Sequence, residues 1–246
     1  MSRIAIIGGT GLTSFRTLNI DHREVVRTPY GDPSAPLTFG TISDTDVVFL
    51  ARHGYGHTIS PHRVNYRANM WALKSLGVEK VIAVAAVGGI RSDLVPASIA
   101  FPDQIIDYTY SRDHTFFDDS EGGVTHIDFT QPYCDAVRDV MIKAAREAGH
   151  QISEHATYGA TQGPRLESAA EIDRLEGDGC DMVGMTGMPE AALARELDLC
   201  YATCAVVANM AAGRGEGVIT MKMVDENLKA GMIKARQLLE AVVPLL

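Results

Sequence analysis

Side chains that can bind an anion follow two apolar, strand-like segments of this chain. Arg52 and His53 come directly after the apolar run Asp46–Ala51, and a GGTGL segment containing Thr10 follows Arg3–Gly8. An arginine offers a two-pronged fork to an oxyanion, and glycine-rich turns point backbone amides at one. Because open α/β sheets bind ligands at the carboxyl ends of their strands, we expect these groups to form one anion site. Either motif alone also fits a structural glycine cluster or a solvated arginine.

Three further strand-like segments end in residues suited to a ligand. Thr186 stands in GMTGMPE, where an apolar run meets a helix start, so its hydroxyl can donate to an anion beside the helix dipole. Asn209 ends a very apolar run, and a buried amide at that place needs a partner. Ala85 and Ala86 begin AAVGG, whose small residues allow a ligand to approach the backbone closely. Convergence of polar groups from separate strands predicts a single binding site.

Several familiar catalytic signatures are absent from the sequence. GGTGL fails as a dinucleotide fingerprint because Ser14 stands where a third glycine is needed, and no Gly-Lys-Ser/Thr follows it. There is no G-x-S-x-G nucleophile elbow, H-E-x-x-H zinc motif or acidic metal cluster, so we predict no metal site. Glu167 in GPRLES, taken alone, is most simply a solvated carboxylate.

These residues need a scaffold of alternating strands and helices. Apolar runs of strand length alternate with helical periods, which is typical of a buried, mostly parallel sheet. The predicted strands are Arg3–Gly8, Asp46–Ala51, Lys80–Val87, Ser98–Ile106, His155–Thr161, Cys180–Met185 and Cys200–Val207. The predicted helices are Val64–Leu76, Cys134–Gly149, a segment from Pro189 and a segment from about Met223. We predict one α/β domain over residues 1–246, with a mixed, mostly parallel central sheet flanked by helices.

The charge balance excludes two classes of partner. The 246 residues include 22 Lys and Arg against 31 Asp and Glu, a formal net charge of −9 at pH 7. Binding to nucleic acid needs dense basic residues, and an anionic membrane repels an acidic protein, so we expect neither partner. The chain opens on a strand-like segment without signal-peptide character, and we expect a cytoplasmic protein.

The four cysteines, Cys134, Cys180, Cys200 and Cys204, are too few for a disulfide scaffold. Cys200 and Cys204 stand four apart in one predicted strand and therefore face the same side. A zinc site would need two further ligands at suitable spacing, which the sequence lacks. We therefore predict buried thiols.

Five longer motifs follow one another along the chain. They are GGTGL, ARHGYGHTISPHRVNYRANMWALKSLGV, GGIRSDLVPASIAFPDQIID, TQGPRLES and MVGMTGMPEAALARELDLCYA. Through them the chain resembles the trimeric purine nucleoside phosphorylase and methylthioadenosine phosphorylase family over nearly its whole length. The resemblance implies phosphorolysis, in which inorganic phosphate attacks C1′ of a purine nucleoside and releases the base and a pentose 1-phosphate. It implies no metal or organic cofactor, and a homotrimer, with a hexamer left open.

The resemblance also implies roles for individual positions. The expected phosphate ligands are Thr10, Arg52, His53 and Thr186, with the backbone at Ala85 and Ala86. Methylthioadenosine enzymes carry Thr where Ala85 stands, so one hydroxyl is lost. Met185 resembles the residue beneath the ribose, and the residues expected to line the base pocket are Val87, Gly88 and Leu166. Asn209, Met210 and Ala211 are further expected substrate-binding residues. His126 resembles a residue that reaches into a neighbouring subunit's pocket, which would make the irregular stretch 107–130 interfacial.

Departures from the family pattern predict which purine is bound. Adenine-specific relatives carry Asp where this chain has Asn209 and Ala211. An asparagine amide donates to a 6-carbonyl, and Glu167 matches the glutamate with which 6-oxopurine enzymes accept from N1–H. Asn209 is therefore the predicted catalytic donor to the leaving base, and Glu167 favours hypoxanthine or guanine over adenine.

The 5′ end of the nucleoside is predicted from a second departure. Inosine-type enzymes place a histidine near the position of Met221, whereas Met221 and Val224 make this corner apolar and suited to a methylthio group. We predict S-methyl-5′-thioinosine as the substrate. The first alternative is inosine or guanosine, followed by methylthioadenosine. An alternative of a different class is a nucleoside-binding module without turnover.

Overall fold

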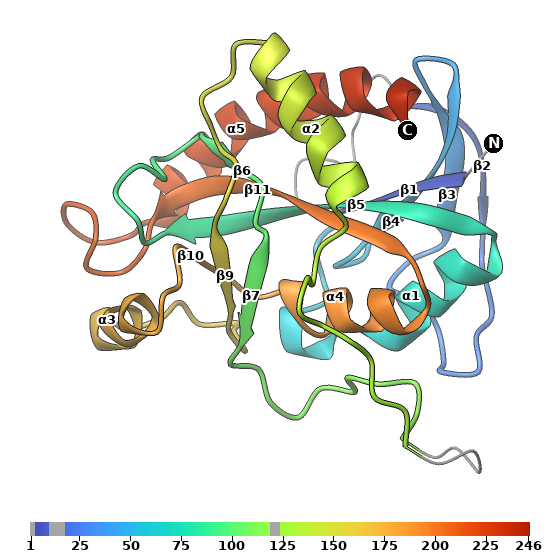
Figure 1. Ribbon diagram of the computed structural model, residues 1–246, viewed down its shortest axis with the longest axis horizontal. Helices are drawn as coiled ribbons and strands as arrows, with labels where there is room; N and C mark the ends of the chain where they lie inside the picture. The colour runs from blue at the N-terminus through green and yellow to red at the C-terminus, as the bar shows by residue number, and fades with distance from the viewer. Residues whose placement is uncertain (1–2, 10–17, 119–123) are drawn as a thin grey trace.

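One sheet organises the molecule in the computed structural model, which describes residues 3–9, 18–118 and 124–246 (Figure 1). Its strands are β1 (Arg3–Gly8), β2 (Asn19–Glu24), β3 (Leu37–Ile42), β4 (Thr45–Ala51), β5 (Val78–Gly89), β6 (Ile99–Ala100), β7 (Gln104–Asp107), β8 (Ile152–Ser153), β9 (Thr157–Ala160), β10 (Met182–Gly184) and β11 (Cys200–Met210). The α-helices are α1 (Tyr66–Ser75), α2 (Asp135–Glu147), α3 (Ala169–Gly177), α4 (Gly187–Glu196) and α5 (Met221–Val242).

The two longest strands, β5 and β11, form the centre of the sheet. They pair in parallel with each other, and β5 also pairs in parallel with β1. Both are almost continuously apolar because helices cover both of their faces. On the β1 side the order continues through β4, β3 and β2, whose last two pairings are antiparallel, and on the other side through β10, β9 and β7. The sheet is therefore mixed and mostly parallel, as predicted.

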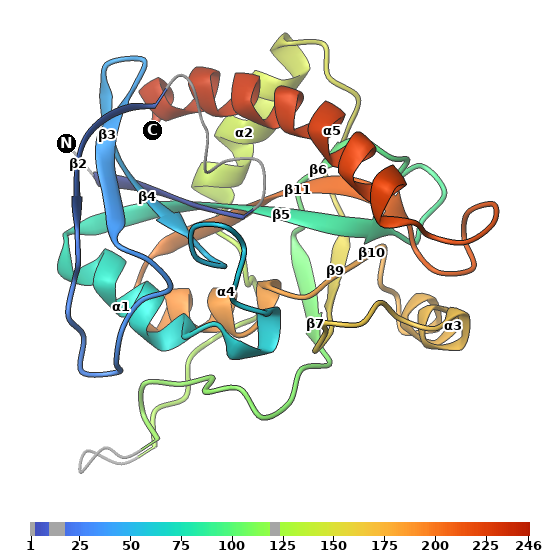
Figure 2. The ribbon, with the colours of Figure 1, turned by 180° about the vertical axis from the view of Figure 1, so that it is seen from behind.

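Each face of the sheet has its own hydrophobic core. Helices α2 and α5 lie on one face, and α1 and α4 lie on the other (Figures 1 and 2). Val137 of α2 and Met232 of α5 belong to the first core. Leu73 of α1 and Leu193 of α4 belong to the second. Two-sided burial of this kind holds the ends of the central strands rigidly in place.

A β-bulge interrupts the pairing of β11 near its carboxyl end. Val207 pairs with Val87 and Asn209 pairs with Gly88, so Ala208 is an extra residue on β11. In a bulge two residues of one strand oppose one residue of its partner, and the strand bends. Ala208 and Asn209 consequently face the same cavity, which is described below.

Most predicted elements are confirmed to within a few residues, but the predicted strand Ser98–Ile106 is wrong as a single element. It is divided into β6 and β7 by the segment around Pro102, which lacks a backbone N–H to continue a ladder. Strands β2, β3 and β8 and helix α3 were not predicted. β2 is exposed along its whole length and shows no apolar alternation. Helix α3 begins at a capping box of Ser168 and Glu171, a signal that was available in the sequence.

The prediction of four buried thiols is wrong for two of the cysteines. Cys134 and Cys200 form a disulfide across 66 residues of sequence. Cys134 is the N-cap of α2 and Cys200 opens β11, so packing of this helix on the sheet brings the two together. Cys180 and Cys204 are free and buried, as predicted. In the described part of the chain, no helix is long and apolar enough to cross a membrane.

Candidate active site

A cavity of about 510 Å³ opens where the central strands end. Its walls come from the ends of β4, β5, β10 and β11, from the segment between β9 and α3, and from the first turns of α5. The cavity brings together most of the predicted site residues: Arg52, His53, Ala85, Ala86, Val87, Gly88, Leu166, Glu167, Met185, Thr186, Asn209, Ala211, Met221 and Val224. Residues that follow separate strands in the sequence therefore share one cavity.

Two other predicted site residues, Met210 and His126, do not line this cavity. Thr10 lies outside the described residues. Met210, which was expected to be a substrate-binding residue, is turned away, because side chains alternate along a strand and Asn209 faces inward. His126 is exposed on the segment between β7 and α2, outside its own chain's cavity.

Arg52 is buried at one end of the cavity and is held by Glu190 of α4. Its Nε and one Nη donate to the two carboxylate oxygens of Glu190 at 2.7 and 2.8 Å, and the other Nη donates to the carbonyl of Val84 at 2.9 Å. Burial opposes the charge of Arg52, but the ion pair outweighs burial and raises its pKa above the usual range. A guanidinium has five N–H groups, so one on each Nη is left for a ligand.

His53 presents a hydrogen-bond acceptor beside Arg52. Its Nδ1 donates to the carbonyl of Ile59 at 2.8 Å, which leaves Nε2 with a lone pair in the neutral ring. Burial, and after it the charge of Arg52, lowers the pKa of His53 to about 4. At neutral pH the ring is therefore uncharged, and Nε2 can accept a hydrogen bond from a protonated ligand oxygen.

Thr186 completes this polar end of the cavity. It is the N-cap of α4, and its hydroxyl is not used to cap the helix. The backbone of Met188 is not helical, so the regular turns of α4 begin after it, and Thr186 contributes its hydroxyl rather than the partial charge of a helix end. Thr58 and Ser60 contribute two further side chains with hydroxyl groups to the cavity wall. Arg52, His53 and Thr186 together can hold one small oxyanion.

A second part of the cavity carries Glu167 and Asn209. The hydroxyl of Thr161 donates to one carboxylate oxygen of Glu167 at 2.6 Å, which leaves the other oxygen for a ligand. The Asn209 amide donates to the carbonyl of Met210 at 2.7 Å, and an amide has a second N–H and an oxygen besides. This pair offers both a donor and an acceptor to the polar edge of a heterocycle.

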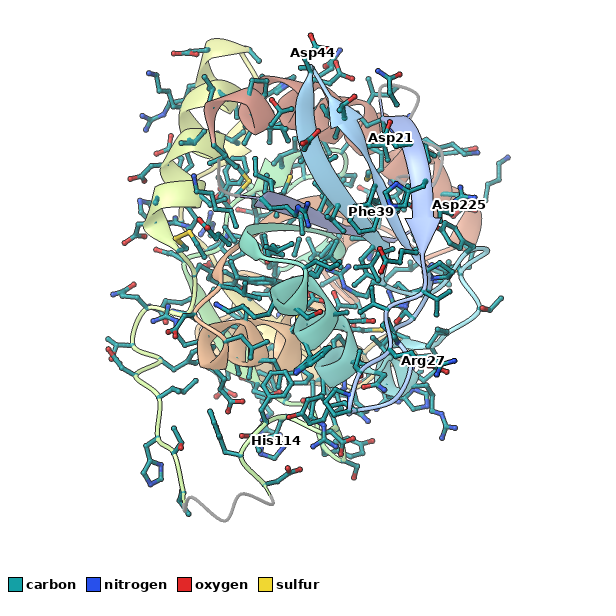
Figure 3. The ribbon with its side chains drawn as sticks, turned by 90° about the vertical axis from the view of Figure 1, so that its right-hand side faces the viewer. Asp21, Arg27, Phe39, Asp44, His114 and Asp225 are labelled. Carbon is teal, nitrogen blue, oxygen red and sulfur yellow. A yellow bond between two sulfur atoms is a disulfide. The ribbon has the colours of Figure 1, made fainter. Side chains whose placement is uncertain are left out.

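The third part of the cavity is apolar. It is formed by Ile219, just before α5, and by one stripe of α5, namely Met221, Val224, Leu228 and Met232. Met221 is 65% exposed, so this corner opens toward solvent. Asp225, labelled in Figure 3, places a carboxylate on the same corner.

Glu190 and Thr161 are the functional positions that the sequence did not reveal. Glu190 was interpretable only as an acid in the first turn of a helix, because its partner Arg52 is 138 residues away. Thr161 could have been noticed six residues before Glu167, but nothing in that spacing alone indicates a contact. Over the described ranges, no three His, Cys, Asp or Glu side chains are grouped as a metal site would require.

Known proteins are similar to this chain along nearly its whole length. The family model described as the phosphorylase superfamily matches residues 3–244. A probable S-methyl-5′-thioinosine phosphorylase of Pseudomonas syringae pv. tomato is 51% identical over 243 residues, which cover 99% of each chain. A 6-oxopurine nucleoside phosphorylase of Pyrococcus furiosus is 47% identical over 251 residues, covering 100% of this chain and 94% of that protein. A structure of Schistosoma mansoni methylthioadenosine phosphorylase with adenine matches with a TM-score of 0.94 at 32% identity, covering 100% of this chain and 92% of that one.

Proposed function

This chain belongs to the phosphorylase superfamily, and from that membership we propose that it cleaves S-methyl-5′-thioinosine with inorganic phosphate. The products are hypoxanthine and 5-methylthioribose 1-phosphate. The enzyme is a pentosyltransferase of the nucleoside phosphorylase type, and its substrates are a nucleoside and phosphate. The observation that carries the choice of nucleoside is one cavity with a carboxylate at its polar edge and an apolar corner formed by α5.

Phosphate occupies the polar end of the cavity in this proposal. Two N–H groups of Arg52 are not used by Glu190 or Val84, and these donate to phosphate oxygens. Thr186 donates another hydrogen bond, and Nε2 of neutral His53 accepts one from a protonated phosphate oxygen. Cleavage of the glycosidic bond gives the sugar oxocarbenium character, and a phosphate anion held against C1′ stabilises that charge.

The base is recognised by Glu167 and Asn209. One carboxylate oxygen of Glu167 is bound by Thr161. The other accepts a hydrogen bond from N1–H of hypoxanthine, a donor that adenine lacks. Asn209 donates to the 6-carbonyl, where negative charge develops as the base leaves. A site built around such hydrogen bonds rejects a mismatched edge by up to about 10⁴-fold.

The test compares four nucleosides with the wild-type enzyme. We expect phosphate-dependent release of hypoxanthine from methylthioinosine with the highest kcat/KM, ahead of inosine and guanosine and far ahead of methylthioadenosine. Faster cleavage of methylthioadenosine would contradict the role of Glu167. Glu167→Ser should narrow the gap between methylthioinosine and methylthioadenosine, with the same four substrates as the measurement.

A second candidate function is phosphorolysis of ordinary 6-oxopurine nucleosides, which Asp225 favours. Its carboxylate lies on the apolar corner and can accept a hydrogen bond from a 5′-hydroxyl. If inosine is the better substrate, Asp225→Ala should lower kcat/KM for inosine and leave methylthioinosine unchanged. If methylthioinosine is the better substrate, Asp225→Ala should still cleave methylthioinosine with a higher kcat/KM than inosine.

We further propose a homotrimer that needs no metal or organic cofactor. Tyr110 and Val124, on the segment between β7 and α2, are large apolar residues that are 67% and 81% exposed, and the exposed His126 follows Val124 by two residues in the sequence. Such exposure suits a subunit contact better than solvent. Sedimentation equilibrium should give three times the mass of the chain, and the rate should not change after treatment with EDTA.

A further inference from the structure

Arg112 is a buried arginine next to the cavity but not in its wall. It is 8% exposed and lies on the segment that follows β7. Arg67 of α1 pairs with Asp113 at 2.9 Å and with Asp118 at 2.7 Å, which anchors this segment below α1. Figure 3 shows the neighbouring His114 at the foot of the helical layer.

The guanidinium of Arg112 binds the backbone of two segments that line the cavity. One Nη donates to the carbonyls of Met185 at 2.9 Å and Met188 at 2.6 Å. The other donates to the carbonyls of Thr161 at 3.2 Å and Gln162 at 2.8 Å. Its Nε donates to the side-chain oxygen of Gln162 at 3.1 Å.

Each of these carbonyls belongs to a residue close to the proposed chemistry. The hydroxyl of Thr161 donates to Glu167, the residue proposed to recognise the base. Met185 lies in the cavity wall next to Thr186. Met188 is two residues before Glu190, which holds Arg52. One side chain thus ties together the backbone of the base end and of the phosphate end.

The charge of Arg112 is compensated in an unusual way. Among the residues that the structure describes, its partners are backbone carbonyls, the side-chain amide of Gln162 and the hydroxyl and ring face of Tyr66, all of them neutral. A buried cation without a carboxylate partner is costly unless its donors are satisfied. Five donors in a planar fork can satisfy several backbone carbonyls at once, which no neutral side chain can do.

Resting on the proposed function, we propose that Arg112 is a positioning residue that sets the distance between base recognition and the phosphate site. After its removal the hydrogen bond from Thr161 N–H to the Gly184 carbonyl, at 2.8 Å, still links the start of the two segments, but the parts beyond it, up to Glu167 and Glu190, can shift relative to each other. Displacements of about 1 Å at a reacting centre cost about 10²-fold in rate. The loss of Arg112 should therefore affect base preference and phosphate binding together.

The test compares Arg112→Met with a matched control, Arg138→Met. Arg138 is also buried and also donates to backbone carbonyls, those of Phe101, Pro102 and Glu154, but it lies on α2 outside the cavity. We expect both variants to lower Tm. Only Arg112→Met should lower kcat/KM for methylthioinosine by about 10²-fold. The same variant should raise KM for phosphate and reduce the preference for methylthioinosine over methylthioadenosine.

Arg112→Lys keeps the charge but has three donors on one nitrogen, and it should restore part of the rate and little of the base preference. If Arg112→Met does not fold, Arg112→Lys is tested instead, by its KM for phosphate and its preference for methylthioinosine over methylthioadenosine. An unchanged base preference together with an unchanged phosphate KM in the folded variants would overturn the proposal. Failure of the wild type to cleave methylthioinosine would instead count against the proposed function. The role of Arg112 would then be tested by comparing wild type and variant for KM of phosphate and KM of the nucleoside that the wild type cleaves best.

Discussion

Two residues at the polar end of the cavity owe their chemistry to their neighbours. Arg52 is oriented by Glu190, which takes one edge of the guanidinium and leaves the other toward the cavity. His53 is neutral because it is buried beside Arg52, and its tautomer is set by the carbonyl of Ile59. The residue types were predictable from their position after a strand, but their protonation and orientation depend on distant partners.

Glu190→Gln should impair phosphate binding selectively. A glutamine presents an N–H₂ group to one of the two Arg52 donors, so the guanidinium must rotate away from its present place. We expect KM for phosphate to rise by about tenfold, with a smaller change in nucleoside KM, and stability to fall by roughly 3 kcal/mol. Steady-state kinetics with varied phosphate measures this, with Asp103→Asn, a carboxylate outside the cavity, as control. An unchanged phosphate KM would show that Arg52 does not depend on Glu190.

The pH dependence of stability should report the burial of His53. Its pKa is about 4 in the folded protein, against an ordinary value of 6.5, so the unfolded chain binds the proton more readily. The resulting stabilisation is complete above pH 6.5 and is lost as the pH falls toward 4, by about 3 kcal/mol. Thermal unfolding of His53→Gln between pH 4 and 8 should show a flatter profile than the wild type. The exposed His22→Gln should keep the wild-type profile.

Among the elements, helix α5 connects the hydrophobic core to the apolar corner of the cavity. Its buried face carries Met232 and Leu238 against the sheet, and its first turns carry Met221 and Val224 into the cavity. Gly231 lets the helix approach β11 closely, since a Cβ there would lie 2.4 Å from a methyl carbon of Val206. The place of the first turns of α5 at the cavity therefore depends on this close approach to β11.

A pair of glycine variants separates packing from helix propensity. Gly231→Ala gains propensity but overlaps Val206, and we expect a net loss of about 1–2 kcal/mol and a higher KM for methylthioinosine. Gly177→Ala at the end of α3 meets no atom within 4 Å and should raise stability by up to about 1 kcal/mol. Urea unfolding of both variants checks this. Equal effects in the two would show that α5 can retreat from the sheet without cost.

The sequence predicted the elements that carry their own signal. β5 and β11 are recognisable by composition, and α2 by its period, whereas β2 is polar and is a strand only because β3 pairs with it. Within the site, Arg52, Thr186 and Asn209 were found because they follow strands. Glu190 and Arg112 were missed because their contacts join segments that are far apart in sequence.

At the scale of the whole molecule, an acidic exterior surrounds a cavity with one cationic end. The net charge of −9 repels anions at long range, so an anionic ligand needs local donors, and the cavity offers Arg52 and Thr186. The fold is also closed by a covalent link, because Cys134 and Cys200 join the start of α2 to the start of β11.

Reduction of this disulfide should destabilise the whole fold. Loss of a crosslink that spans 66 residues relaxes the unfolded chain and corresponds to about 4 kcal/mol in the chain-entropy account. We expect dithiothreitol to lower Tm of the wild type, and the double variant Cys134→Ser and Cys200→Ser to have a similarly low Tm that no longer responds to reductant. A reductant response that persists in the double variant would assign the effect to another cause.

The bulge at Ala208 has a consequence for how such an enzyme changes over evolutionary time. Before it, β11 is locked in register with β5 and buried on both faces, so substitutions there threaten folding. After it, the ladder has shifted, and Asn209 faces the cavity, whereas Ala211 lines the cavity and also packs in a small hydrophobic core with Ile172 and Val183. Under the proposed function, Asn209 is therefore a base-contacting position that mutation can alter without rebuilding the sheet, which lets a lineage exchange one purine for another in small steps.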